Sequence, residues 1–282
     1  MHGLRKLFYT ILAVFITSGS FAQDLPDTVL YAKDSVIDVN AMVDCQSAFF
    51  ERTERVPSFG STKIVNKAGK IVTMTSFLAS NDMGVESQHA VIDLDNDGKK
   101  ELVIFNYTGG AHCCDEYYFF KNIGLNKYQY IGKTFGGDVC VNDKNEFVYY
   151  FNQSFGYFFT CFACTYADNS DEGPLPVDHI TLQYQKGKLA VKKGDSELRS
   201  MINDNLAKLA EQPYQPLEED IDQDNGLRKE FAKNLAVFYY SFGKNIAQTQ
   251  ALFNKYYKHP DAKKVWAAFV KQLQYMKKDN TF

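Results

Sequence analysis

Hydrophobic positions between residues 63 and 193 fall into short runs that turn residues separate. The runs are rich in β-branched and aromatic residues, which is typical of strands, and the signals NDG, GG and KGK indicate turns between them. The intervals leave no room for crossover helices, so consecutive strands are expected to pair antiparallel. The pattern predicts an antiparallel β-rich body, arranged as a meander, a barrel-like sheet or a propeller-blade-like sheet. The expected strands are KIVTMTSFL, HAVIDLD, ELVIFNYTG, EYYFFKN, KYQYIGKTF, EFVYYFNQSF, YFFTCFACTY and HITLQYQKGKLAVKK.

After residue 194 the hydrophobic spacing becomes helical. Asp195 or Ser196 is a suitable helix cap, and a proline-containing acidic linker, PYQPLEEDIDQDNG, separates the first helical stripe from the next. We therefore expect an α+β protein in which residues 23–194 form the β-rich domain and residues 195–282 form a helical C-terminal segment. The three stripes are Leu198, Ile202, Leu206 and Leu209; then Leu227, Phe231, Leu235, Phe238 and Phe242; then Val265, Trp266, Phe269 and Leu273.

Residues 1–22 have the pattern of a signal peptide. Positive residues precede an uncharged apolar run, Leu7–Thr17, and small residues at Ser20 and Ala22 follow it. The run falls short of the roughly 20 residues that span a bilayer, which argues against a membrane anchor. The pattern predicts cleavage after Ala22 and export to the periplasm, the cell surface or the medium.

A short acidic stretch between two expected strands has the spacing D-x-D-x-D-G-x-x-E. Calcium takes six to eight oxygen ligands, and a tight loop supplies them when alternate carboxylates turn inward and a glycine allows the sharp turn. The stretch therefore predicts a calcium site. Its expected ligands are the side chains of Asp93, Asp95, Asp97 and Glu101 and the backbone carbonyl of Lys99.

Two other interpretations of this stretch are less favourable. An EF-hand needs a glutamate at the twelfth loop position, where this chain has Ile104, and its flanks would be helices. A plain Asn-Asp-Gly turn with solvated aspartates is the simpler alternative. Acids crowded into one turn repel each other unless a cation neutralises them, which favours calcium.

The run VIDLDNDGKKELVIF resembles the FG-GAP/VCBS-type calcium-binding repeat. The resemblance implies a strand–loop–strand unit of a propeller blade with a structural calcium ion, as in extracellular recognition proteins. The following TGGAHCC is similar to a motif of exported bacterial proteins that carry the same loop. Only one good loop is present, whereas propellers need about four to eight blades. A partial echo at Asp220, Asp222 and Asp224 is interpreted as an acidic helix cap.

Six cysteines in an exported chain predict structural disulfides, although the sequence does not determine their pairing. A zinc or copper site at His112 with Cys113 and Cys114 is an alternative, but neighbouring strand residues point to opposite faces. The CFAC spacing is that of thiol–disulfide enzymes, yet its expected strand context lacks the helix N-terminus that activates such thiols. The candidate disulfide residues are Cys45, Cys113, Cys114, Cys140, Cys161 and Cys164.

Charge is unevenly distributed along the chain. Residues 226–282 contain 11 Lys and Arg residues against 3 Asp and Glu residues, whereas the whole chain has a net charge of −3. This basic segment is expected either to dock on the acidic body or to be attracted to an anionic cell surface.

These features predict an exported, non-enzymatic calcium-binding protein with a structural or interaction role, whose partner is another protein or an envelope component. No nucleic-acid partner is expected. The sequence contains no G-x-S-x-G elbow, P-loop, H-E-x-x-H or G-x-G-x-x-G motif. Two alternatives stay open: an exported hydrolase with a structural calcium, and a thiol- or metal-handling protein that uses His112 and the cysteines.

Overall fold

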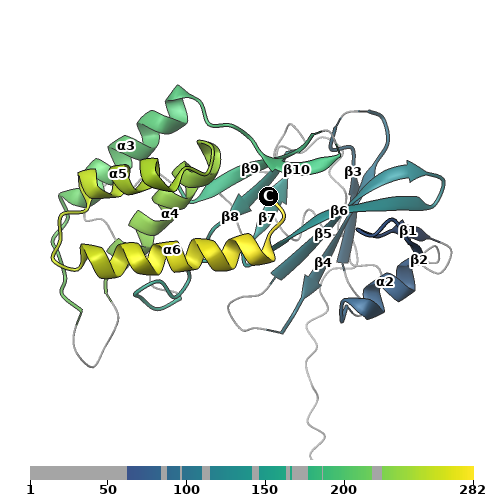
Figure 1. Cartoon of the computed structure of the whole chain (residues 1–282), viewed down its shortest axis with the longest axis horizontal. Coiled ribbons are helices and arrows are strands. Elements are labelled where there is room, and N and C mark those ends of the chain that lie inside the picture. Colours follow the sequence, from purple (N-terminus) through teal and green to yellow (C-terminus); the bar gives the residue numbers. More distant parts are fainter. Residues whose placement is uncertain are drawn as a thin grey trace, which may run out of the picture.

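The computed structural model describes residues 62–83, 88–95, 97–109, 115–141, 146–162, 166, 177–185, 187–217 and 224–282. Several sequence predictions fall outside these residues: the signal peptide, Cys45, His112, Cys113, Cys114, Cys164, Asp220 and Asp222. The described part has two sheets followed by helices, which confirms the α+β class. In Figure 1 the four-stranded sheet lies between the C-terminal helices and the six-stranded sheet.

The first sheet has the strand order β2-β1-β6-β5-β4-β3. Strands β3 to β6 form an antiparallel meander, as the sequence predicts. The pair β1–β6 is instead parallel, and these two strands are distant in the chain. The strands are β1 (Lys63–Val65), β2 (Ile71–Thr73), β3 (Gln88–Ile92), β4 (Glu101–Tyr107), β5 (Asp115–Gly124) and β6 (Lys127–Phe135).

The prediction of one strand over KIVTMTSFL is wrong in its second half, where helix α2 (Met74–Ser80) follows β2 directly. The Thr73 hydroxyl oxygen accepts a hydrogen bond from the Ser76 N–H at 3.1 Å and so caps the helix. Met74, Phe77 and Leu78 then lie on one helical face, and this face packs on the first sheet. Capping and the helical spacing of these apolar residues override the β-branched run.

The second sheet is antiparallel, with the order β10-β9-β8-β7. The expected strand YFFTCFACTY is not one over its described residues 157–162, which form turns and irregular structure after β8. Phe158 is buried there, and its N–H donates to the Phe155 carbonyl of the preceding turn. Other bonds are long-range, because the Asp224 N–H donates to the Phe159 carbonyl at 2.7 Å and the Thr160 hydroxyl donates to the Asp224 carbonyl at 3.0 Å. The strands are β7 (Val139–Val141), β8 (Phe147–Tyr150), β9 (His179–Gln185) and β10 (Lys188–Val191).

Four helices complete the described chain: α3 (Ser196–Ala210), α4 (Leu227–Ser241), α5 (Ile246–Tyr256) and α6 (Ala262–Asp279). The three predicted stripes lie on α3, α4 and α6, and most of their residues are buried. No predicted stripe corresponds to helix α5, which begins after the Asn245 N-cap. None of the described helices combines the length and hydrophobicity needed to span a bilayer.

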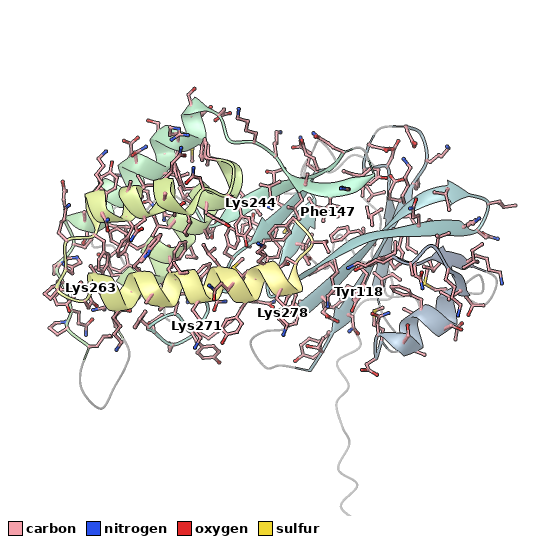
Figure 2. The ribbon with its side chains drawn as sticks, in the orientation of Figure 1. Tyr118, Phe147, Lys244, Lys263, Lys271 and Lys278 are labelled. Carbon is pink, nitrogen blue, oxygen red and sulfur yellow. The ribbon has the colours of Figure 1, made fainter. Side chains whose placement is uncertain are left out.

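One hydrophobic cluster joins the two sheets to the helices. The rings of Phe119 on β5 and Phe147 on β8 meet edge to face at 4.8 Å, and Figure 2 shows Phe147 near the middle of the molecule. The end of the chain adds polar bonds, because the Lys133 N–H donates to the Thr281 hydroxyl at 2.8 Å and the Thr281 N–H donates to the Lys133 carbonyl at 3.0 Å. The C-terminus is thus tied to β6.

Asp224 is the one described aspartate of the expected acidic cap; the N-cap residue of α4 is Gly226, and Asp224 lies two residues before it. This side chain is fully buried and accepts hydrogen bonds from the N–H groups of Gly226 and Arg228. The Arg228 guanidinium also pairs with Asp224 at 2.6 Å and with Asp261 at 2.7 Å. The buried arginine therefore links the start of α4 to the start of α6.

Candidate metal centre

The acidic stretch forms the loop between β3 and β4, whose last paired residues are Ile92 and Glu101. Antiparallel strands flank the loop, which agrees with the strand–loop–strand interpretation and differs from the two helices of an EF-hand. Gly98 has φ of +81°, the left-handed conformation that a side chain disfavours. The glycine therefore makes the sharp turn that the sequence predicts.

Asp93 organises the loop backbone. Its Oδ1 accepts a hydrogen bond from the Asp97 N–H at 3.1 Å, and its Oδ2 accepts one from the Gly98 N–H at 2.9 Å. Asp97 Oδ1 similarly accepts from the Lys99 N–H at 2.9 Å. These bonds curl the loop toward the Asp93 carboxylate and leave further lone pairs on both of its oxygens.

Glu101 lies at the base of the loop and has no exposed surface. Its two carboxylate oxygens accept hydrogen bonds from the N–H groups of Leu94, at 3.0 Å, and Asn122, at 3.4 Å. Burial raises the pKa of Glu101 above its ordinary 4.5; the two N–H donors oppose this shift, and the charges of Asp95 and Asp97 add to it. The fold therefore holds a carboxylate where its charge is costly unless a cation is near.

The structure brings three of the predicted ligands together. Ligand atoms of Asp93, Asp95 and Glu101 all lie within 4.8 Å of one another, and within the described chain no other such group of three His, Cys, Asp or Glu residues occurs. Asp95 Oδ1 is buried and has no hydrogen-bond partner among the described residues. A buried carboxylate oxygen without a donor keeps the lone pairs that could ligate a cation.

Asp97 lies outside this group of three, and its Oδ2 faces Lys121. Lys99 donates its N–H to Asp97, and the predicted role of its carbonyl stays a prediction. Of the four expected carboxylate ligands, three therefore converge, and the fourth, Asp97, lies beside them.

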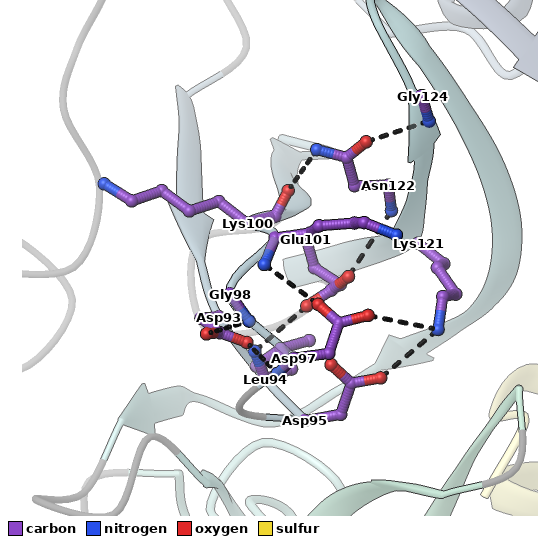
Figure 3. Close-up of polar contacts among 11 residues, drawn as sticks. Asp93, Leu94, Asp95, Asp97, Gly98, Lys100, Glu101, Lys121, Asn122 and Gly124 are labelled. Atoms are coloured by element: carbon purple, nitrogen blue, oxygen red, sulfur yellow. Dashed lines mark hydrogen bonds and ion pairs between the residues drawn. The ribbon is translucent and has the colours of Figure 1, made fainter.

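Lys121 on β5 is the residue that sequence reasoning missed. Its Nζ lies 3.2 Å from Asp95 Oδ2 and 3.9 Å from Asp97 Oδ2 (Figure 3). It also lies 5.0 Å from the centre of the Tyr184 ring. Burial lowers the pKa of Lys121, but the hydrogen bond to Asp95 and the surrounding negative charge outweigh it, so the pKa is raised above 10.5. The ammonium stays charged and neutralises part of the acidic loop.

Strand pairing explains how Lys121 reaches the loop. Leu102 on β4 pairs with Phe120 on β5, so the next step of the register places Glu101 opposite Lys121. Opposed residues of an antiparallel pair project on the same face. The D-x-D-x-D-G pattern gives no sign of Lys121. The contact could be expected only if the pairing of β4 with β5 were known.

The donor set consists of carboxylate oxygens alone. Such ligands suit hard cations such as calcium and magnesium, whereas zinc and copper sites use imidazole or thiolate. The residues present therefore fit a divalent hard cation. Three side chains supply fewer than the six to eight oxygens that calcium needs, so backbone carbonyls and water would complete the shell.

Two of the six cysteines lie within the described residues. Cys140 on β7 is 2% exposed and packs with Val148 and Tyr150, whereas Cys161 lies in the irregular segment after β8. Neither is a free thiol. Which cysteines pair therefore stays a prediction.

Comparison of the chain with protein-family models, with curated proteins and with solved structures gave no match. The resemblance to FG-GAP/VCBS-type repeats therefore rests on the loop residues alone.

The turn at Gly98 can be tested by substitution. Nothing lies within 4 Å of a Cβ added there, so any cost of Gly98→Ala comes from backbone conformation. We expect Gly98→Ala to lower the free energy of unfolding by about 1 kcal/mol, measured by urea denaturation in a chelator. Gly98→Asn should cost less, because asparagine tolerates positive φ. Equal losses in the two variants would contradict a left-handed turn at this position.

Proposed function

We propose that this is an exported, non-enzymatic calcium-binding protein with a structural or interaction role in the periplasm or at the cell surface. The loop between β3 and β4 is its ion site. The observation that carries this proposal is the convergence of Asp93, Asp95 and Glu101, in which Asp95 Oδ1 is buried without a donor. The signal-peptide pattern supports export.

Charge balance in the loop favours a divalent ion over the lysine alone. Asp93, Asp95, Asp97 and Glu101 carry four negative charges when ionised, and Lys121 supplies one positive charge on one side of the cluster. The buried Glu101 carboxylate receives only backbone donors. An ion bound between the three carboxylates would offset this repulsion directly.

Lys121 and the ion would compete for Asp95. Calcium binds carboxylate oxygens at about 2.3–2.6 Å, and an ammonium 3.2 Å from the same carboxylate would repel it. The proposal therefore includes displacement of Lys121 from Asp95 when calcium binds. The lysine would offset part of the negative charge of the loop, and calcium would have to bind tightly enough to displace it from Asp95.

A structural role is supported by the contacts of Glu101, which connect the loop to β5. Glu101 accepts from Leu94 within the loop and from Asn122 on β5, so one carboxylate connects the hairpin to the next strand. Binding of an ion to the folded state alone stabilises it by mass action, by about 2.7 kcal/mol at a hundredfold excess over Kd. Calcium would thus brace the β3 edge of the first sheet.

The partner is proposed to be another protein or an envelope component. Lys263, Lys271 and Lys278 occupy exposed positions along α6 (Figure 2). These lysines are available for an anionic surface, and the helices themselves contact the sheets largely through the apolar cluster.

Calorimetry with calcium tests the ion site. We expect the purified protein to bind calcium and Asp95→Ala to weaken binding at least about tenfold, because it removes one charged ligand. Lys121→Met should bind calcium more tightly than the wild type, since the competing ammonium is gone. Asp204→Ala, which removes an exposed acid on α3, is the matched control and should leave binding unchanged.

Two results would defeat this account. One is the absence of calcium binding in the wild type and in Lys121→Met alike. The other is equal binding by the wild type and Asp95→Ala.

Thiol counting in denaturant, without reductant, tests the structural disulfides. If the six cysteines form structural disulfides, as expected for an exported chain, we expect fewer than four of them to react. Addition of a reductant before denaturation is the control and should expose all six. Reaction of four or more thiols without reductant would show that disulfides do not brace the protein.

A further inference from the structure

A cavity of about 540 Å³ lies between α2, the turn joining β1 to β2, and the face of β5 and β6. This volume is in the range of small-molecule sites, about 300–1,000 Å³. Figure 2 shows Tyr118, one of its lining residues, on the side of the first sheet near α2. The cavity shares no residue with the loop between β3 and β4.

Aromatic rings form one wall of the cavity. Phe77 and Tyr118 are buried, whereas Tyr130 is partly exposed, and the ring centres of Phe77 and Tyr130 lie 5.6 Å apart. Phe77 also contacts Tyr118 edge to face at 6.0 Å. The two buried rings pack against Tyr130, whose partly exposed side chain lines the cavity.

The lining is basic. It contains Lys67, Lys70 and Lys133 and no acidic residue. Lys133 is already paired, because its Nζ lies 2.6 Å from Glu116 Oε1, which is outside the lining. Lys67 Nζ lies 5.4 Å from the centre of the Tyr130 ring. Lys67 and Lys70 therefore add two positive charges to a lining that also contains Tyr130.

The turn that carries these two lysines has a defined shape. Asn66 Oδ1 accepts hydrogen bonds from the N–H groups of Ala68 and Lys70, both at 3.0 Å, and Gly69 has φ of +75°. Such a side-chain-to-backbone turn holds the backbone on either side of the glycine. Local sequence thus places both lysines in the lining, which contains no carboxylate to neutralise them.

We propose that this cavity binds a small aromatic acid. The carboxylate of the ligand meets Lys67 and Lys70, and its ring packs on the exposed part of Tyr130. Ser76, Ser80 and Asn81 of α2 also line the cavity and supply hydroxyl and amide groups for polar substituents. The site is independent of the calcium loop and would exist whether or not that loop binds an ion.

An NMR titration of the isotope-labelled protein with three matched probes tests this site. Benzoate has both the ring and the charge, benzyl alcohol lacks the charge, and acetate lacks the ring. We expect benzoate to bind about tenfold more tightly than either of the others and to shift resonances of the cavity residues, since two exposed ion pairs contribute modestly. Titrations in calcium and in chelator should agree.

Variants separate this site from nonspecific charge attraction. The double variant Lys67→Gln/Lys70→Gln should weaken benzoate binding about tenfold and leave benzyl alcohol binding unchanged. Lys188→Gln, at an exposed position on β10, is the control and should bind benzoate as the wild type does. Equal affinity for acetate and benzoate, or unchanged benzoate binding in the double variant, would overturn the proposal.

Discussion

Repulsion among the carboxylates of the loop between β3 and β4 is the constraint on which the site depends. Asp93, Asp95 and Glu101 converge within 4.8 Å, and Glu101 is fully buried. Backbone N–H groups and the Lys121 ammonium offset part of this repulsion. Asp95 Oδ1, however, has no donor among the described residues. Additional positive charge between the carboxylates of Asp93, Asp95 and Glu101 would therefore stabilise the loop.

Long-range pairing supplies the parts that the loop itself lacks. The pairing of β4 with β5 brings Lys121 to the loop beside Glu101, whose carboxylate accepts from the Asn122 N–H, and the Lys121 ammonium lies over the Tyr184 ring of β9. The contact between Phe119 and Phe147 holds the two sheets together, and Thr281 ties the end of the chain to β6 next to β5. The geometry of the ion site thus depends on the whole β-rich body and on the C-terminal helices that cover it.

Much of this architecture could be predicted from local patterns. Strands β3 and β4, the turn at Gly98 and the stripes of α3, α4 and α6 follow from periodicity and from residues that act on their own neighbours. The hydrophobic patterns predicted the wrong secondary structure where tertiary contacts or helix caps determine it. Thr73 caps a helix inside an apparent strand, and Phe158 enters the core from a turn. The parallel pair β1–β6 has no local signal.

The site shows the same division. Alternation of Asp93, Asp95 and Asp97 correctly marked an acidic loop, but it could not show that Asp97 turns toward Lys121 or that Lys121 is present at all. A crystal structure of the protein grown with calcium tests the central claim most directly. The account predicts an ion bound by Asp93, Asp95 and Glu101, with Lys121 Nζ displaced from Asp95. A calcium-saturated crystal in which Lys121 still pairs with Asp95 and no ion lies between the three carboxylates would contradict it.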